Sequence, residues 1–232
     1  MLRRVTGIRV FERPTLAAAW LDVSGAILEH GADARYDGEP TKELANVTAV
    51  VLAPDPDDAL IARLGDPEWT AWMHRNFTEP TPVPELGHAA SYATRLYDYA
   101  GTGRDQVAWV IARLEEDPGC RSATITTFQP VTDTTYVPCV SMLDFWRPDP
   151  DGPVELVVYA HSLDFGKKAY ANLVELARLQ HRVAAGVGAP VGRLVLHTKS
   201  AHVYQPEWEP MRRLCRRDEE LVAVVDESHD ER

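Results

Sequence analysis

The residue of this chain best suited to covalent chemistry is Cys139, which directly follows a proline between two strand-like runs. Polar side chains that could meet it in one cavity follow in the order Ser162, Asp164, Asn172, His202 and Tyr204. A thiol held at the end of a strand becomes a strong nucleophile when nearby cations lower its pKa from about 8.5 toward neutrality. A single cysteine can also be buried and inert. We interpret Cys139 as a nucleophile because of the polar series that follows it.

Strands are predicted to position this series. Runs of β-branched and apolar residues predict strands at 122–130, 137–146, 154–162 and 191–204. The turn-rich segment 148–152 predicts a hairpin, so Cys139 and Ser162 are expected on neighbouring antiparallel strands that line one cavity. His202 and Tyr204 lie two positions apart on the last strand and are therefore expected to face the same side.

The predicted fold class is α+β, with a mixed sheet packed against one long core helix at 168–186. All 232 residues are expected to form a single domain. Further elements predicted upstream are strands at 6–12 and 45–53 and helices at 15–30, 57–64, 67–77, 87–99 and 104–116. The polar segment 35–44 is expected to be an exposed loop, in which Arg35 and Lys42 are candidate phosphate ligands.

Charge and cysteine content disfavour several classes of protein. The formal net charge of −11 disfavours general binding of nucleic acids, because that relies on a basic field. Three widely spaced cysteines predict neither a disulfide framework nor a structural metal site, and they favour a reducing compartment. No segment has the apolar length of a signal-peptide core or of a membrane span, so we expect a cytoplasmic protein. The acidic tail at 216–232 is interpreted as a solvated end.

An ordered set of motifs resembles one enzyme family. The set comprises the Pro138-Cys139 pair, the segment YAHSLD at 159–164, Asn172 on the next helix and the segment AHVY at 201–204. Upstream, the segments SYATRLYDY and DQVAWVIARLEEDPGCR are similar to two further stretches of that family. In this order the motifs resemble thymidylate synthases and pyrimidine nucleotide hydroxymethylases. The resemblance covers residues 85–208 well and the N-terminal third loosely.

The resemblance implies a covalent mechanism for one-carbon transfer. The Cys139 thiolate would add to C6 of a pyrimidine nucleoside 5′-monophosphate (dUMP, dCMP or CMP), which turns C5 into a carbon nucleophile. That carbon would receive a one-carbon unit from 5,10-methylenetetrahydrofolate, and the product would carry either a methyl or a hydroxymethyl group. A thiolate suits this chemistry because it is a soft nucleophile that can also leave again at the end.

The resemblance also implies a homodimer whose subunits share the phosphate site. Arg121 would cross a sheet-to-sheet interface and bind the nucleotide phosphate that Ser162 contacts in the other subunit. Arg121 would also supply the cation that the thiolate needs. His161 stands where the family has an arginine before the serine, and it would face the same phosphate. A guanidinium suits this role because it binds phosphate bidentately. Taken alone, Arg121 could equally be a solvated arginine at a turn.

Contacts with the base and the sugar follow from the same resemblance. Asp164 would order water and backbone amides beside the ring, and Asn172 would bind the edge of the base. Because an amide offers both a donor and an acceptor, Asn172 leaves uracil and cytosine open. His202 and Tyr204 would bind the sugar 3′-hydroxyl, whereas without the family they could be an ordinary strand pair.

Departures from the family pattern concern proton transfer and the cofactor step. The family's Glu-Leu-Leu-Trp segment has no clear counterpart, and Glu68, followed by Trp69 and Trp72, is its substitute as a catalytic acid or base. Asp144 replaces a glutamine, which suggests a wetter cavity and favours hydroxymethylation. Alternatively, Asp144 faces solvent and Trp69 or Trp72 supplies an apolar wall. Val140 stands in place of a histidine, which favours the alternative function of a noncatalytic nucleotide-binding or structural paralogue.

Overall fold

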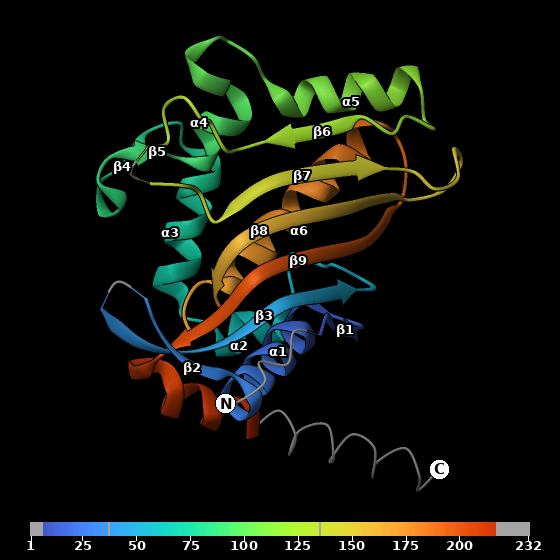
Figure 1. Ribbon diagram of the computed structural model, residues 1–232. Coiled ribbons are helices and arrows are strands. Elements are labelled where there is room, and N and C mark those ends of the chain that lie inside the picture. The colour runs from blue at the N-terminus through green and yellow to red at the C-terminus, as the bar shows by residue number, and fades with distance from the viewer. Residues whose placement is uncertain (1–6, 37, 135, 217–232) are drawn as a thin grey trace, which may run out of the picture.

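The computed structural model describes residues 7–36, 38–134 and 136–216. A mixed sheet lies at its centre (Figure 1), and its strands are β1 (Arg9–Arg13), β2 (Ala32–Tyr36), β3 (Glu39–Val51), β6 (Ala123–Thr126), β7 (Val140–Trp146), β8 (Val154–Asp164) and β9 (Val191–Tyr204). The strand order is β1-β3-β9-β8-β7-β6, and β2 pairs with β3 off this path. The pairs β1/β3 and β8/β9 are parallel, and the others are antiparallel. A separate two-stranded sheet consists of β4 (Pro82–Val83) and β5 (Ala89–Ala90).

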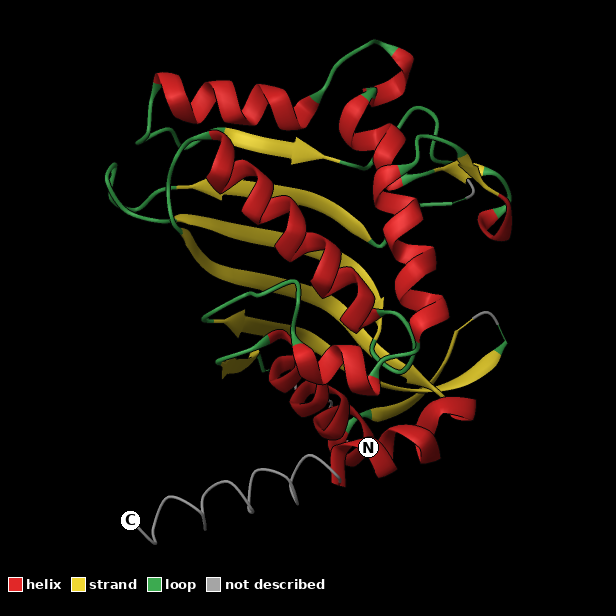
Figure 2. Cartoon of the chain, turned by 180° about the vertical axis from the view of Figure 1, so that it is seen from behind, coloured by secondary structure: helices red, strands yellow, loops and turns green. Residues whose placement is uncertain are grey.

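The long helix α6 (Ala169–Gly186) crosses one face of the sheet, as Figure 2 shows from behind. The other helices are α1 (Leu16–His30), α2 (Ala59–Leu64), α3 (Pro67–Thr78), α4 (Tyr92–Tyr97), α5 (Gln106–Glu116), the 3₁₀ turns η1 (Pro84–Leu86), η2 (Tyr99–Gly101) and η3 (Gln205–Glu207), and a last helical segment at 208–216. The predicted α+β fold with one long core helix is thus confirmed. Among the described helices, none has the length and apolar character needed to cross a membrane.

Apolar burial and one buried amide hold α6 against the sheet. Leu156 of β8 and Leu176 of α6 are fully buried in the same core. Burying a side chain of this kind stabilises a fold by roughly 1.5–3 kcal/mol. Gln180 on α6 donates through Nε2 to the backbone oxygens of Val154 and Gly192, at 2.9 and 3.0 Å. The helix is therefore tied to the start of both parallel strands, β8 and β9.

The hairpin predicted around 148–152 is confirmed. β7 and β8 are antiparallel neighbours, with Val140 opposite Ala160 and Phe145 opposite Leu156. Just before β7, the Cys139 backbone oxygen accepts a hydrogen bond from the His161 backbone nitrogen at 3.0 Å. The cysteine and the YAHSLD segment are therefore neighbours, as the sequence predicted.

The predicted loop at 35–44 is wrong, because this segment forms most of the hairpin between β2 and β3. Thr41 and Leu44 are almost completely buried, and β3 pairs with β9 from Thr41 opposite Tyr204 onward. Ladder hydrogen bonds on both sides satisfy the backbone of this central strand, which outweighs its polar composition.

The helix predicted at 87–99 is shortened to α4. Gly87 and His88 have φ angles of 64° and 61°, in the left-handed region that an α-helix cannot use. Ser91 then caps the helix, since its Oγ accepts a hydrogen bond from the Thr94 backbone nitrogen at 3.1 Å. The acidic tail lies outside the described residues from position 217 onward.

The face of the sheet opposite α6 carries partly exposed apolar side chains. Side chains alternate along a strand, so Val157 and Tyr159 of β8 point away from the helix. Met142 and Trp146 of β7 lie beside them, and Met142 pairs directly with Tyr159. The exposed fractions of Met142, Trp146 and Tyr159 are 41%, 39% and 40%. In Figure 1 this face of β7, β8 and β9 is turned toward the viewer, and none of the described helices covers it.

Candidate active site

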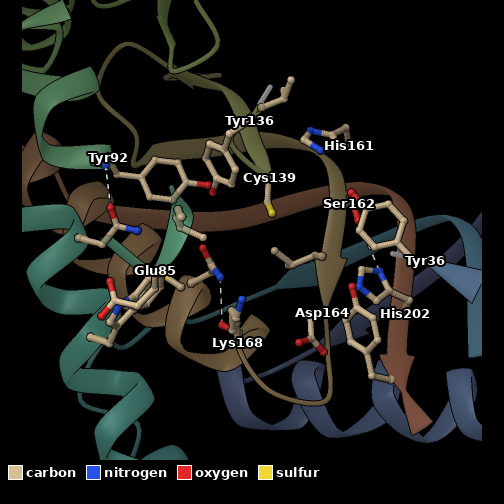
Figure 3. A pocket seen from close by; sticks show the side chains of 18 residues that line it. Tyr36, Glu85, Tyr92, Tyr136, Cys139, His161, Ser162, Asp164, Lys168 and His202 are labelled. Atoms are coloured by element: carbon tan, nitrogen blue, oxygen red, sulfur yellow. Dashed lines mark hydrogen bonds between the residues drawn. The ribbon is translucent and has the colours of Figure 1, made fainter. Parts of the chain in front are cut away.

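A cavity of about 570 Å³ lies where β8 and β9 end and β7 begins (Figure 3). Its size is in the range of small-molecule sites, roughly 300–1,000 Å³. Residues predicted from the sequence that line it are Cys139, His161, Ser162, Asp164, Asn172, His202 and Tyr204. The remaining wall is formed by Tyr36, Trp72, Met73, Asn76, Glu85, Leu86, Tyr92, Tyr136, Val137, Leu163 and Lys168. The parallel pairing of β8 and β9 explains the convergence, because their carboxyl ends meet at one edge of the sheet.

Cys139 is held by hydrogen bonds of the backbone on either side of it. Its own carbonyl oxygen is bonded to His161, and the next nitrogen, that of Val140, donates to the Tyr92 hydroxyl at 3.0 Å. Figure 3 shows the sulfur directed into the cavity, with Tyr92 and Tyr136 on one side and His161 on the other. Burial raises the pKa of both tyrosine hydroxyls, so they stay neutral. The backbone around the thiol therefore has a fixed position, and two neutral tyrosines lie on one side of the sulfur.

The charge state of Cys139 is set by opposing effects. Burial raises the pKa of the Cys139 thiol above its usual value, Lys168 lowers it, and Asp164 raises it again. The net shift is upward. The activation expected from nearby cations is therefore incomplete in the single chain, and Lys168 is the cation that opposes burial.

A buried ion pair fixes the segment that leads to Cys139. Arg95 on α4 is 1% exposed and donates to both carboxylate oxygens of Asp133 and to the Thr127 backbone oxygen. The Thr127 hydroxyl in turn donates to the Val140 backbone oxygen. Thr127 and Asp133 are thus attached to α4 through Arg95, and Val140 is attached to it through Tyr92.

Asp164 ends β8 beside the first turn of α6. Burial raises its pKa to about 6, although Lys168 and a hydrogen bond from the Gly166 backbone nitrogen at 3.0 Å act in the other direction. This carboxyl group can consequently exchange a proton near neutral pH, which suits a group that orders water and transfers protons.

The side-chain amide of Asn172 has a fixed orientation. Its Nδ2 donates to the Lys168 backbone oxygen at 3.0 Å, and a carbonyl oxygen can only accept, so the nitrogen and oxygen cannot be exchanged. Its Oδ1 is buried and forms no hydrogen bond within the described chain. A buried acceptor without a partner costs about 1–3 kcal/mol. A ligand that donates a hydrogen bond at this point would remove that cost.

Both histidines of the cavity are neutral at pH 7. Burial lowers the pKa of His202, and burial together with Lys199 lowers the pKa of His161. His202 Nδ1 lies 3.5 Å from the Ser162 hydroxyl oxygen, and its ring lies 5.0 Å from that of Tyr204. These side chains can therefore offer hydrogen bonds to a nucleotide, but no positive charge.

Four predicted residues do not line this cavity. Arg35 and Lys42 lie on the β2–β3 hairpin, where Arg35 binds a backbone oxygen of the turn and Lys42 pairs with Asp33 at 3.0 Å. Glu68 is exposed in the first turn of α3, and Arg121 is exposed between α5 and β6. Arg35 and Lys42 are therefore held by contacts within the hairpin, while Glu68 and Arg121 face solvent.

Asp144, on which the expectation of a wetter cavity rested, does not line the cavity. Asp144 accepts a hydrogen bond from the Thr124 hydroxyl at 2.8 Å and lies in mid-strand, away from the cavity. Trp72 lines the cavity and packs edge-on against Trp69, with ring centroids 5.5 Å apart. The apolar wall that the sequence left as an alternative is therefore present. Among the described residues, the glutamate at this cavity is Glu85 of η1.

Four residues of the cavity were not predicted as site residues: Tyr36, Glu85, Tyr92 and Tyr136. Tyr36 ends a strand whose polar composition is typical of a loop. Glu85 lies in a proline-rich segment without helical or strand periodicity. Tyr92 stands in the SYATRLYDY segment, and Tyr136 comes three positions before the cysteine, so these two could have been found from the family motifs.

Comparisons with known proteins agree with this geometry. A family model described as thymidylate synthase matches residues 57–228. A protein of Methanosarcina acetivorans with the name "Putative thymidylate synthase" is 32% identical over 211 residues, which cover 87% of this chain and 92% of that protein. A protein of the same name from Methanococcoides burtonii is 29% identical over 218 residues, covering 90% and 95%. A thymidylate synthase of Agaricus bisporus is 27% identical over 128 residues, covering 53% and 43%. This chain therefore belongs to the thymidylate synthase family of methyltransferases.

Proposed function

We propose that this enzyme methylates C5 of a pyrimidine nucleoside 5′-monophosphate through a covalent adduct between Cys139 and C6. The observation that carries the proposal is the shared cavity, in which the Cys139 sulfur and the unpartnered Oδ1 of Asn172 are both present. One atom can attack a ring carbon while the other binds the ring's edge. The family membership gives the reaction class.

In the proposed reaction the Cys139 thiolate forms a bond to C6, and the C5–C6 electron pair moves through C4 onto O4 of uracil or onto N3 of cytosine. Asn172 Oδ1 accepts a hydrogen bond from the base, either from N3–H of uracil or from the amino group of cytosine. Asp164 and Glu85 are the acids of the cavity, and we assign to them the proton at C5 and the ordering of water. Elimination of Cys139 at the end restores the thiolate.

The one-carbon unit would come from 5,10-methylenetetrahydrofolate, which supplies both the methylene group and the hydride of a methylation. The cavity suits its flat pterin ring, since Trp72, Met73 and Leu86 provide an apolar wall next to the polar groups. Such a wall also keeps water away from an exocyclic methylene group, which favours methylation over hydroxymethylation.

The phosphate site is proposed to be shared by two subunits. One subunit offers Ser162 and neutral His161, and no arginine is among the described residues that line the cavity. Its Arg121 is exposed beside the sheet, and the uncovered apolar face with Met142 and Tyr159 is suited to an isologous sheet-to-sheet contact. A second copy would then bring Arg121 to the phosphate.

Isotope release tests the proposed reaction. Purified protein is incubated with [5-³H]dUMP, [5-³H]dCMP or [5-³H]CMP, with and without methylenetetrahydrofolate, next to a Cys139→Ala variant. We expect cofactor-dependent release for one nucleotide and none for the variant. Dihydrofolate that forms in step with a product heavier by one methylene unit establishes methylation, while tetrahydrofolate with a hydroxymethyl product establishes hydroxymethylation. Equal release from both proteins would refute the role of Cys139.

A second candidate function is nucleotide binding without turnover. The raised pKa of Cys139 and the neutral His161 favour it, since both weaken catalysis. Calorimetry separates the two: binding of a nucleotide without any tritium release supports the binder, and release supports the enzyme. We further propose that the protein works in a reducing compartment such as the cytoplasm, because its three cysteines are widely spaced in the sequence.

A further inference from the structure

One lysine lies at the centre of the proposed active site. Among the described residues that line the 570 Å³ cavity, Lys168 is the one lysine or arginine. Asp164 and Glu85 are the carboxylic acids there, and the histidines are neutral. The positive charge of the cavity in a single chain thus depends on this one side chain.

The backbone of Lys168 is fixed between two groups of the site. Its nitrogen donates to the Asp164 backbone oxygen at 3.1 Å, and its oxygen accepts from both the backbone nitrogen and Nδ2 of Asn172, each at 3.0 Å. Lys168 immediately precedes α6. Its Cα therefore cannot move without displacing the carboxylate and the amide that the reaction uses.

The side chain of Lys168 is also restricted. Its Nζ lies 5.3 Å from the ring centroid of Trp69 and 5.9 Å from that of Trp72. Contacts of a cation with the faces of two indoles hold the ammonium group at the cavity wall. Figure 3 shows Lys168 on the floor of the cavity, below Cys139 and beside Asp164.

The positive charge of Lys168 shifts the pKa values of the titratable groups around it. It opposes the effect of burial on the pKa of the Cys139 thiol and of the Asp164 carboxyl, and it helps to keep His202 neutral. Three reactive groups from three different strands or strand ends are therefore influenced by one ammonium group.

We propose that Lys168 is the cation that stabilises the Cys139 thiolate from within the same subunit, and that it compensates the negative charge that appears on the base, at O4 of uracil or N3 of cytosine, when the thiolate adds to C6. The first part concerns the protein alone, and the second rests on the proposed function. In the addition step the sulfur–C6 bond forms, the C5–C6 electron pair moves onto O4 of uracil or N3 of cytosine, and the ammonium group donates a hydrogen bond to that atom while keeping its proton. Elimination reverses these changes, so no further reactant is needed.

The neighbouring lysine provides a matched control. Lys167 carries the same charge, and its Nζ lies 5.2 Å from the ring centroid of the same Trp69. It lines a separate cavity of about 230 Å³ and approaches Glu207 at 3.9 Å. A change at Lys167 removes one positive charge from the same turn without removing one from the active-site cavity.

The test measures the pH dependence of alkylation of Cys139 by iodoacetamide, followed on the Cys139 peptide by mass spectrometry. We compare the wild type with Lys168→Gln, Lys168→Arg and Lys167→Gln, each shown to be folded by its thermal unfolding. We expect Lys168→Gln to move the midpoint to higher pH and to slow alkylation at pH 7.5 about tenfold. Lys168→Arg should stay within about threefold of the wild type, because its charge remains. Lys167→Gln should match the wild type.

Equal midpoints for Lys168→Gln and the wild type would overturn the proposal. So would equal shifts in Lys168→Gln and Lys167→Gln, since the effect would then be one of net charge. Alkylation needs no nucleotide, so it is independent of the proposed reaction. A shifted midpoint in a protein without tritium release would refute the proposed function and keep the thiolate assignment. Tritium release by the wild type with an unchanged midpoint in Lys168→Gln would support the proposed function and refute the thiolate assignment.

Discussion

Arg95 Nη1 and Nη2 lie 2.6 and 2.8 Å from the two carboxylate oxygens of Asp133, in an ion pair that is almost inaccessible to solvent. Arg95 also binds the Thr127 backbone oxygen. The pair consequently fixes the chain on the way to Cys139, although it does not line the main cavity. Such a geometry couples the stability of the protein to the position of its nucleophile.

Removing one partner of this pair should strongly destabilise the protein. Arg95→Met leaves the Asp133 carboxylate buried without its partner, and we expect the free energy of unfolding to fall by about 3–5 kcal/mol. Urea denaturation at pH 7 measures it. The double variant Arg95→Met/Asp133→Leu should lose less than Arg95→Met alone, and a double variant that loses more would contradict the role of the pair.

The pH dependence of this effect has a defined sign. Burial alone would raise the pKa of Asp133, but hydrogen bonds from Arg95 and the Gln129 backbone nitrogen hold it below its usual value. The contribution of the pair is therefore present above about pH 4 and is lost as the pH falls further. The difference between wild type and Arg95→Met should shrink in that acidic range.

Asp164→Asn should stabilise the protein at neutral pH. The folded pKa of Asp164 is about 6, above the ordinary value of 3.8, so the folded state holds the proton more tightly than the unfolded state. The contribution of this group is full below about pH 4 and is lost as the pH rises through 6. At each pH we compare the free energy of unfolding of Asp164→Asn with that of the wild type. We expect this difference to favour the variant by roughly 1–3 kcal/mol more at pH 7.5 than at pH 4. Denaturation curves at both pH values measure this, and tritium release should be lost. An identical difference at both would contradict the raised pKa.

Tyr92→Phe should weaken both stability and turnover. The change removes the hydroxyl that accepts from the Val140 backbone nitrogen, and an unpaired buried donor costs about 1–3 kcal/mol. Tyr97→Phe is the matched control, because the Tyr97 hydroxyl binds the exposed Arg182. Thermal unfolding and tritium release should change little in the control. Equal losses in both variants would mean that the contact with Val140 has no special importance.

Asn172→Ala should weaken nucleotide binding by about fivefold to a hundredfold, because the acceptor for the base is lost. Calorimetry with the nucleotide that the wild type prefers measures it. Gln180→Met serves as the comparison: Gln180 is also buried on α6, but it binds strand backbone at the far end of the helix. Gln180→Met should lower the stability of the protein and leave the affinity of the folded protein for the nucleotide unchanged. Unchanged affinity in Asn172→Ala would refute the proposed base contact.

Mixing inactive variants tests the shared phosphate site. If Arg121 crosses the interface, an equal mixture of Cys139→Ala and Arg121→Ala subunits should regain up to about a quarter of the wild-type activity, because half of the dimers have one intact site. A mixture of Cys139→Ala and Ser162→Ala should regain none, since both groups belong to the same subunit's site. Recovery in neither mixture would place Arg121 elsewhere.

The sequence predicted the strands of the central sheet where apolar patterning was strong. The run of β-branched residues in β9 and the turn before β8 allowed both strands and their neighbours to be inferred. The strand predicted at 45–53 matches the second half of β3, but the first half was missed, because Glu39, Lys42 and Glu43 conceal a strand whose place is decided by its partners on both sides. Local composition cannot reveal that pairing.

The site could be predicted where family motifs carry it and not elsewhere. Motifs led to Cys139, Asn172 and His202, which do share one cavity. They gave no sign of Glu85, which enters the cavity from a proline-rich turn. Nor could they show that Asp144 points away from the cavity, since a shift of one position along a strand reverses the direction of a side chain.

The hydrogen bond from Asn172 to the Lys168 backbone oxygen also limits how this enzyme can evolve toward another base. An aspartate at position 172 would place a carboxylate oxygen against that carbonyl oxygen, so two acceptors would face each other. A lineage that exchanged this asparagine for an aspartate would first have to rearrange the start of α6 or bind the nucleotide with a protonated carboxyl group. One ordinary helix contact therefore restricts which residue type position 172 can accept without a change in the surrounding backbone.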